Sequence, residues 1–292
     1  ERYERETGTK IQLLSDGAPV LIERLAAEGD NTRADLFMAV DAGSLWQAAE
    51  RGLLAPVQSP ALEAAIPAHL RDPQGRWFAL SQRARTIVYS TERVDPAELS
   101  GIGDLARRKW RGRLCLRSSK KVYNQSLVAT LVERIGVDYT ETVVRGWVAN
   151  LATAPFADDT LLAKAIAAGQ CDVGIINTYY LGRLQHDDPG FPVQVFWANQ
   201  NGVGAHVNVS GAGIVAASKQ KDEARKFLEW LASESVQADF ASVNFEIPAR
   251  PGVALDPVVA AWGPFKADPV NVSVAGARQA EAVKLMDRAG WR

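Results

Sequence analysis

Cysteine and histidine are scarce in this chain of 292 residues, which contains two cysteines, Cys115 and Cys171, and three histidines. A zinc site needs more Cys or His in one place, and a thiol nucleophile needs a partnering histidine. Each cysteine opens a strand-like run, RLCLR or CDVGII. Two readings stay open for them: two buried thiols, or one disulfide, which would imply an oxidising compartment.

The chain also lacks an excess of charge and a long apolar run. Its 33 basic and 34 acidic residues give a net charge of -1, which argues against partners held by bulk electrostatics, such as nucleic acid or a membrane surface. No stretch approaches the roughly 20 apolar residues of a membrane span. The G-x-S-x-G, Walker and H-E-x-x-H motifs are absent. With no paired base and nucleophile, we do not expect an enzyme.

Short apolar strands alternate with helical segments through most of the chain, which is typical of an α/β protein. Leu127, Val128 and Leu131 lie on one stripe of a predicted helix that ends at Gly136. Residues 219–242 are expected to form one long amphipathic helix. No shift in composition marks a domain boundary, so we expect two interleaved domains, an arrangement that provides a hinge and a cleft. Strands are expected in ADLFMAVD, RTIVYS, GRLCLRSS, CDVGII, FPVQVFWA and HVNVSGAGIVAAS.

Three of the six tyrosines stand where a predicted strand gives way to a helix. Tyr179 and Tyr180 follow CDVGIINT, in which Asn177 or Thr178 could cap the helix, and Tyr123 follows RLCLRSSKKV. Proteins of the α/β class bind ligands at this edge of the sheet, and helix N-termini favour anions. A phenol ionises at neutral pH only beside a cation or such a dipole, and a trivalent hard cation would stabilise it strongly. Simple packing, with the hydroxyl groups in water, is the alternative.

RSSKKVYNQSLVATLV and CDVGIINTYYLGRL resemble the two central motifs of the periplasmic ferric-ion-binding proteins of ABC transporters. The similarity extends to ADLFMAVDAGSLW, QRARTIVYS, HVNVSGAGI and NFEIPARPG, and so covers nearly the whole chain. The resemblance implies a two-lobed type II periplasmic binding protein-like fold that closes on one Fe(III), with Tyr123, Tyr179 and Tyr180 as phenolate ligands. Arg83 matches a cleft arginine that balances phenolate charge or holds a synergistic anion such as carbonate or citrate.

The chemistry of these residues agrees with that expectation. Fe(III) is a hard cation that prefers anionic oxygen donors, and three phenolates cancel its charge. Because the ligands must lose their protons, affinity is expected to fall at low pH.

The resemblance also implies a place and a partner. Lobe 1 is expected to comprise residues 1–82 and approximately 207–255, and lobe 2 approximately 83–206 and 256–292. We expect an exported, periplasmic monomer that delivers Fe(III) to an ABC permease in the membrane and binds no nucleic acid. The alternative is a binding protein of the same fold for a small organic anion or a polyamine.

The first residues, ERYERETGTKIQLLSD, contain no initiator Met and no signal peptide, and are expected to form a helix that runs into a strand, IQLL. Relatives supply a further ligand, often a His-Tyr pair, from a first strand before such a segment. The resemblance therefore implies that this strand and its ligand are missing here, and that water or an anion completes the metal shell. Elsewhere, Asp41 is interpreted as a helix cap, His206 as structural and Glu246 as a salt-bridge partner. Lys120 and Lys121 either raise the potential near Tyr123 or are simply solvated.

Overall fold

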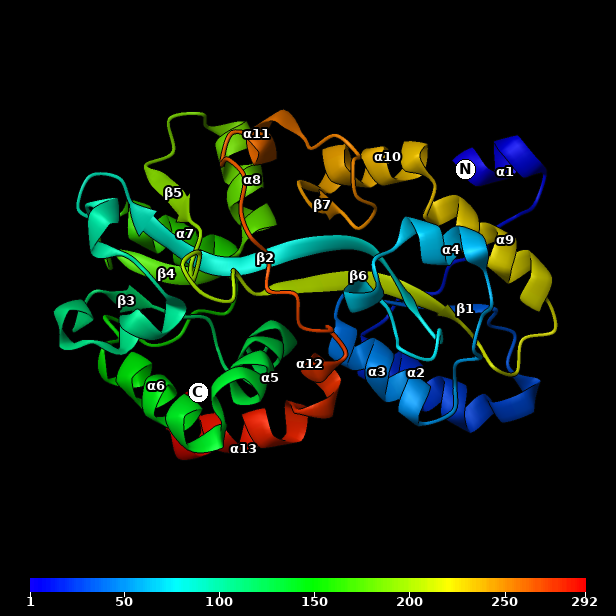
Figure 1. Cartoon of the computed structure of the whole chain (residues 1–292), viewed down its shortest axis with the longest axis horizontal. Helices are drawn as coiled ribbons and strands as arrows, with labels where there is room; N and C mark the ends of the chain where they lie inside the picture. Colours follow the sequence, from blue (N-terminus) through cyan, green and yellow to red (C-terminus); the bar gives the residue numbers. More distant parts are fainter.

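The computed structural model describes all 292 residues, which form an α/β molecule of two lobes joined by long strands (Figure 1). No helix combines the length and the apolar character needed to cross a membrane. The helices are α1 (Arg2–Thr7), α2 (Ala18–Glu28), α3 (Ala42–Glu50), α4 (Pro60–Ala65), α5 (Val122–Ile135), α6 (Val137–Ala149), α7 (Asp159–Ala167), α8 (Thr178–Asp187), α9 (Lys221–Leu231), α10 (Glu234–Asn244), α11 (Pro257–Ala260), α12 (Val274–Ala277) and α13 (Gln279–Arg288). The 3₁₀ helices are η1 (Gly29–Asn31), η2 (Ala68–Leu70), η3 (Pro96–Glu98), η4 (Ile102–Ala106) and η5 (Arg108–Trp110).

One long strand connects the two halves of the sheet. The strands are β1 (Leu36–Ala39), β2 (Phe78–Ser90), β3 (Leu114–Cys115), β4 (Val173–Asn177), β5 (Val193–Phe196), β6 (Val207–Ile214) and β7 (Ile247–Pro248). Their order is β1-β6-β2-β4-β3, and β5 and β7 also pair with β2. The first part of β2 pairs with β6, and its last part pairs with β4. In Figure 1, β2 and β6 run side by side across the middle of the molecule. Only β3 and β4 are parallel to each other.

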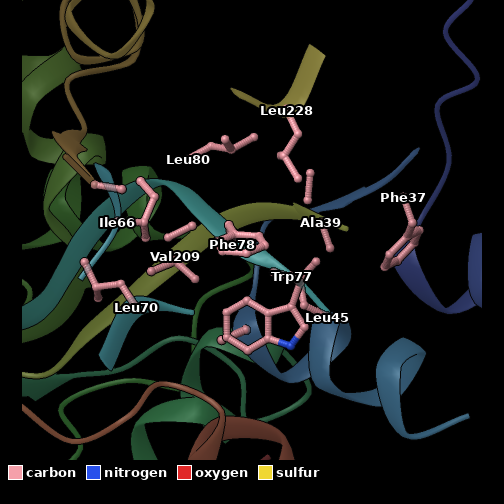
Figure 2. Packing of buried hydrophobic residues seen from close by; sticks show 14 of the residues in the cluster. Phe37, Ala39, Leu45, Ile66, Leu70, Trp77, Phe78, Leu80, Val209 and Leu228 are labelled. Atoms are coloured by element: carbon pink, nitrogen blue, oxygen red, sulfur yellow. The ribbon is translucent and has the colours of Figure 1, made fainter. Parts of the chain in front are cut away.

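The apolar core is divided between the lobes. The larger cluster packs β1, β6 and the start of β2 against α3, α4 and α9, and Trp77, Phe78 and Leu45 are completely buried in it (Figure 2). A second cluster joins α5, α6 and α13 to the far end of β2. A third lies where α7 packs against β4. Burial of one such large side chain stabilises the fold by about 1.5–3 kcal/mol. Because the clusters are separate, each lobe has a core of its own. The lobe boundaries expected from the sequence stay a prediction.

Capping residues determine where the helices near the lobe junction begin and end. Asp41 is the N-cap of α3, and its Oδ1 accepts hydrogen bonds from the backbone N–H groups of Gly43 and Ser44, as predicted. Asp158 caps α7 in the same way. The predicted stripe on α5 is present, and the helix ends at Gly136, whose φ of 76° favours glycine.

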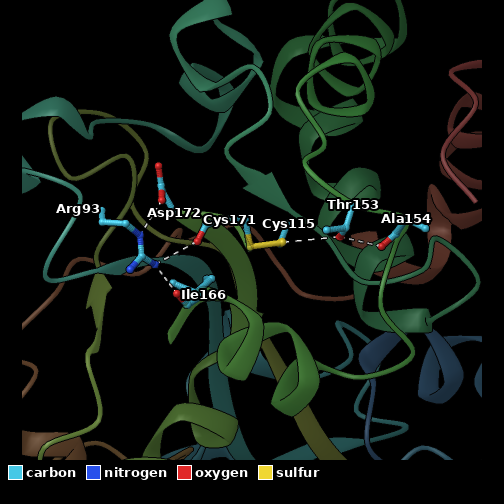
Figure 3. Close-up of a disulfide and its surroundings, with 7 residues drawn as sticks. All are labelled: Arg93, Cys115, Thr153, Ala154, Ile166, Cys171 and Asp172. Carbon is cyan, nitrogen blue, oxygen red and sulfur yellow. Dashed lines mark hydrogen bonds and ion pairs between the residues drawn. A yellow bond between two sulfur atoms is a disulfide. The ribbon is translucent and has the colours of Figure 1, made fainter. Parts of the chain in front are cut away.

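Cys115 and Cys171 form a disulfide (Figure 3), so of the two readings left open by the sequence the disulfide is the one found. Both residues are buried. Arg93 makes hydrogen bonds next to the disulfide: its guanidinium donates to Asp172, at 2.9 Å, and to the backbone oxygens of Ile166 and Cys171. The bond links β3 to the start of β4, the two parallel strands that precede the tyrosine-bearing helices.

Two predictions of local structure were wrong. IQLL is not a strand, because it pairs with no strand of the sheet, and Leu13 remains 84% exposed. The long helix expected over residues 219–242 is two helices, α9 and α10, because Ser233 is extended (φ -68°, ψ 152°) and begins a new helix. The break lets Gln237 enter the core, where its amide donates to the carbonyl oxygens of Leu80 and Leu231.

Candidate functional site

All three predicted tyrosines lie at helix N-termini that face a common cavity. Tyr123 is the second residue of α5, and Tyr179 and Tyr180 are the second and third residues of α8. The strands β3 and β4 that lead to these helices are parallel neighbours, which is why two segments far apart in the sequence end at one place. Asn177 occupies the N-cap position of α8, but its side chain makes no capping hydrogen bond.

The cavity has a volume of about 380 Å³ and walls from both lobes. Met38 of β1, Val40 just after β1, and Ser210 of β6 line it, and Glu246 lines it from the segment before β7. The opposite wall consists of the three tyrosines and Arg183. A ligand in this cavity would therefore touch both lobes, as expected for a cleft that closes on its cargo.

The three phenols lie close to one another. The hydroxyl oxygens of Tyr179 and Tyr123 are 3.4 Å apart, within hydrogen-bond distance. The rings of Tyr179 and Tyr180 are stacked, with their centroids 4.4 Å apart. Tyr123 and Tyr179 are buried and Tyr180 is partly exposed. Both buried phenols line the cavity, so their burial by itself does not separate a ligand role from packing.

Four cationic side chains surround the tyrosine rings. Lys121 Nζ lies 5.0 Å from the centroid of Tyr123. Arg183 lies 5.1 Å from the centroid of Tyr179, and Arg117 Nη1 lies 3.4 Å from the hydroxyl of Tyr180. Arg83 lies 5.7 Å from the centroid of Tyr123. The aromatic faces attract these cations, and the cations in turn favour the charged form of a phenol.

Arg83 is the buried cation with spare donors. Its side chain is 1% exposed, and its Nη2 donates to the backbone oxygen of Val40 at 2.6 Å and to Ser210 Oγ at 3.0 Å. Its Nε and Nη1 have no hydrogen-bond partner. The carboxylate of Glu246 is 3.6 Å from Nε, close enough for an ion pair, as predicted for Glu246. A buried guanidinium with unused N–H groups beside a cavity is suited to an anion.

Burial governs protonation at the site. It raises the pKa of Tyr179 far above that of an ordinary phenol, and the neighbouring Tyr123 oxygen raises it further, whereas the charge of Arg83 opposes both. Without a cation in the cavity, Tyr179 is therefore a neutral phenol. Burial lowers the pKa of Arg117, but the charge of Asp159 and the oxygen of Tyr180 raise it more, so the net pKa is raised.

Sequence reasoning missed two of the four cations. Arg183 follows Tyr179 by one helical turn, a spacing that places both on one face of α8, so this signal was available. Arg117 gave no such signal, because it is far from Tyr180 in the sequence and the two residues meet only in the folded protein. His206 is buried away from the tyrosine cavity. No group of three or more His, Cys, Asp or Glu residues is arranged to hold a metal ion, so the tyrosines are the chain's strongest candidates for metal ligands.

Comparison with known proteins places the chain in a family. Residues 31–267 match the model of a family described as bacterial extracellular solute-binding protein. Iron uptake protein A1 of Synechocystis is 43% identical over 297 residues, covering 100% of this chain and 82% of that protein.

Two solved structures are similar over almost their full length. One is Trichodesmium IdiA (FutA) in complex with iron and citrate ligands, with a TM-score of 0.96 and 45% identity, covering 100% of this chain and 94% of that one. The other is the ferric binding protein of Campylobacter jejuni, with a TM-score of 0.93 and 35% identity over the same shares of the two chains. The resemblance drawn from the tyrosine motifs is confirmed, and this chain belongs to the bacterial extracellular solute-binding protein family, among its ferric-ion-binding members.

Proposed function

We propose that this protein captures Fe(III) in the cavity between its lobes, with Tyr123, Tyr179 and Tyr180 as phenolate ligands. The observation that carries the proposal is the meeting of three phenols, two of them buried, at the N-termini of α5 and α8. Fe(III) is a hard cation that three phenolate oxygens neutralise. The iron-binding relatives in the same family support this choice of cargo.

Arg83 is proposed to hold an anion that shares the metal. Its free Nε and Nη1 groups face two of the tyrosines and need an acceptor. Carbonate and citrate are both suitable, and water can occupy any position that remains. A relative of this chain binds iron together with citrate, which supports an anion of this class. In this proposal Arg83 also favours ionisation of the phenols as the metal arrives.

The wider role follows from the family. We propose that the protein works as an exported, periplasmic monomer, that it passes its iron to an ABC permease in the membrane, and that it is a binding protein rather than an enzyme. Closure of the lobes would bring Ser210 and Glu246 towards the tyrosines, since these residues form opposite walls of one cavity.

A small organic anion is the second candidate cargo, because Arg83, Arg117 and Arg183 all lie beside the cavity or its tyrosines. The same cations argue against a polyamine, which carries positive charge and finds one carboxylate, Glu246, among the residues that line the cavity.

The test is optical titration of the metal-free protein with Fe(III), supplied as its nitrilotriacetate complex. Ferric phenolate absorbs visible light through charge transfer, so the wild type should become coloured, and Tyr123→Phe and Tyr179→Phe should weaken or shift the band. Tyr139→Phe is the matched control, because Tyr139 lies on α6, outside the cavity. A wild type that stays colourless, and gains no thermal stability from Fe(III), would reject iron as the cargo. Stabilisation by citrate in a protein that stays colourless with Fe(III) would favour the organic-anion alternative.

A further inference from the structure

We infer that Arg85 is a positioning residue for the iron site: a buried network centred on its guanidinium holds the two tyrosine-bearing helix starts in register. This inference rests on the proposed function. It concerns residues that line no part of the cavity, so none of them is offered as a ligand.

Arg85 uses all of its guanidinium nitrogens inside the protein. It lies on β2 opposite Asn177 of β4, and its side chain is 1% exposed. Its Nη1 donates to Asp159 Oδ2 at 2.8 Å and to Asn177 Oδ1 at 3.1 Å. Its Nε donates to Asn124 Oδ1 at 2.9 Å, and its Nη2 donates to the backbone oxygen of Ile175 at 3.2 Å. A planar fork with five donors is suited to joining several segments at once.

The partners of Arg85 stand next to the tyrosines in the chain. Asn124 directly follows Tyr123, and its amide also donates to the backbone oxygens of Arg117 and Ser118, in the loop before α5. Asn177 is the N-cap residue of α8, just before Tyr179 and Tyr180. The Asn177 side chain does not cap α8 because its oxygen accepts a hydrogen bond from Arg85 instead. One guanidinium thus ties both tyrosine-bearing junctions to the central strand.

Asp159 extends the network to the third phenol. Its carboxylate is completely buried, and it balances the charge of Arg85 while also accepting from the backbone N–H of Asn177 at 3.0 Å. The same carboxylate lies 3.8 Å from Arg117 Nη1, which in turn contacts the hydroxyl of Tyr180. Buried charges need such pairing, so the positions of Arg85, Asp159 and Arg117 depend on one another. Their common effect is to fix where the three phenol oxygens lie relative to each other.

The test compares iron binding with folding stability in four proteins: the wild type, Arg85→Lys, Asn124→Ala and Val144→Ala. Arg85→Lys keeps the charge but loses the fork, and Asn124→Ala removes a neutral partner of Arg85. Val144 is buried in the core on α6 and belongs to no part of the network, so its truncation lowers stability alone. Affinity for Fe(III) is measured by competition with EDTA, and the ferric phenolate band is recorded at saturation.

We expect the two network variants to bind iron about 10- to 100-fold more weakly, the range found when partners that orient metal ligands are removed. Their charge-transfer maximum should shift, because the phenolate geometry changes. Val144→Ala should keep the wild-type band and affinity despite a lower Tm. If Arg85→Lys does not fold, Asn124→Ala decides the question.

Wild-type affinity and spectrum in the folded network variants would overturn the inference, as would an equal loss of affinity in Val144→Ala. A colourless wild type rejects the proposed function itself, and with it this inference, whereas a coloured wild type with unaffected network variants rejects the inference alone.

Discussion

Removal of the disulfide should destabilise the protein by an amount that follows from the length of the loop it closes. Cys115 and Cys171 are separated by 56 residues. In the chain-entropy account, closing a loop of this size in the unfolded state corresponds to about 4 kcal/mol at 25 °C. Both cysteines are buried in an apolar cluster, so loss of the two sulfur atoms adds a packing cost to the entropic one. We therefore expect Cys115→Ala/Cys171→Ala to lose at least about 4 kcal/mol of unfolding free energy.

The assay is urea unfolding of the wild type and the double variant, with and without reductant. The wild type should unfold at a higher urea concentration without reductant, and its m-value should be lower than that of the variant, because the cross-linked unfolded chain exposes less surface. Reductant should lower the wild-type midpoint towards that of the variant and leave the variant unchanged. Equal midpoints and equal m-values for the oxidised wild type and the double variant would refute the reasoning, as would two free thiols titrated in the denatured, unreduced wild type.

Three other predictions concern protonation and buried polar contacts. Burial lowers the pKa of His206 from about 6.5 to about 4. Between these two values the imidazole is protonated in the unfolded chain but neutral in the folded protein, so about 3 kcal/mol of stability should be lost as the pH falls from about 6.5 to 4. Chemical denaturation across this range should show that the unfolding free energy of His206→Gln depends less on pH than that of the wild type. Identical pH dependence in the two proteins would contradict the assignment. Because burial raises the pKa of Tyr179 in the metal-free protein, Fe(III) must displace its proton. Competition with EDTA, corrected for the protonation of EDTA, should therefore show the affinity for Fe(III) decreasing as the pH decreases, and a pH-independent affinity would exclude this phenol as a ligand. Gln237→Leu should lower the unfolding free energy measured in urea by at least about 2 kcal/mol, because it removes the amide that donates to the buried carbonyl oxygens of Leu80 and Leu231. A decrease below about 0.5 kcal/mol, typical of surface substitutions, would show that water replaces the amide.

Features that depend on local sequence were predictable. The apolar stripe of α5 and its end at Gly136 follow from helical periodicity and from the positive φ that glycine accepts. The cap at Asp41 follows from the same kind of local rule. Tyr123 and Tyr179 could be placed at helix starts because strand-like runs precede them, and their meeting was expected from the edge of a sheet and from the family resemblance.

Features that depend on long-range pairing were not predictable from the chain alone. The disulfide requires β3 and β4 to be neighbours, which periodicity does not reveal. IQLL looks like a strand, but a strand needs a partner and none is present. The break at Ser233 is accompanied by a buried contact of Gln237 with Leu80, which lies far away in the sequence. Arg85 belongs to the same class, since its role appears only when three separate segments meet around one guanidinium.

The central claim is that three phenolates hold one Fe(III) between the lobes. Its most direct test is a crystal structure of the iron-loaded protein with anomalous diffraction data collected at the iron absorption edge. We expect one strong anomalous peak in the cavity, within bonding distance of the hydroxyl oxygens of Tyr123, Tyr179 and Tyr180, with an anion or water between the metal and Arg83. A peak elsewhere in the molecule, or a peak in the cavity that the tyrosine oxygens do not reach, would contradict it.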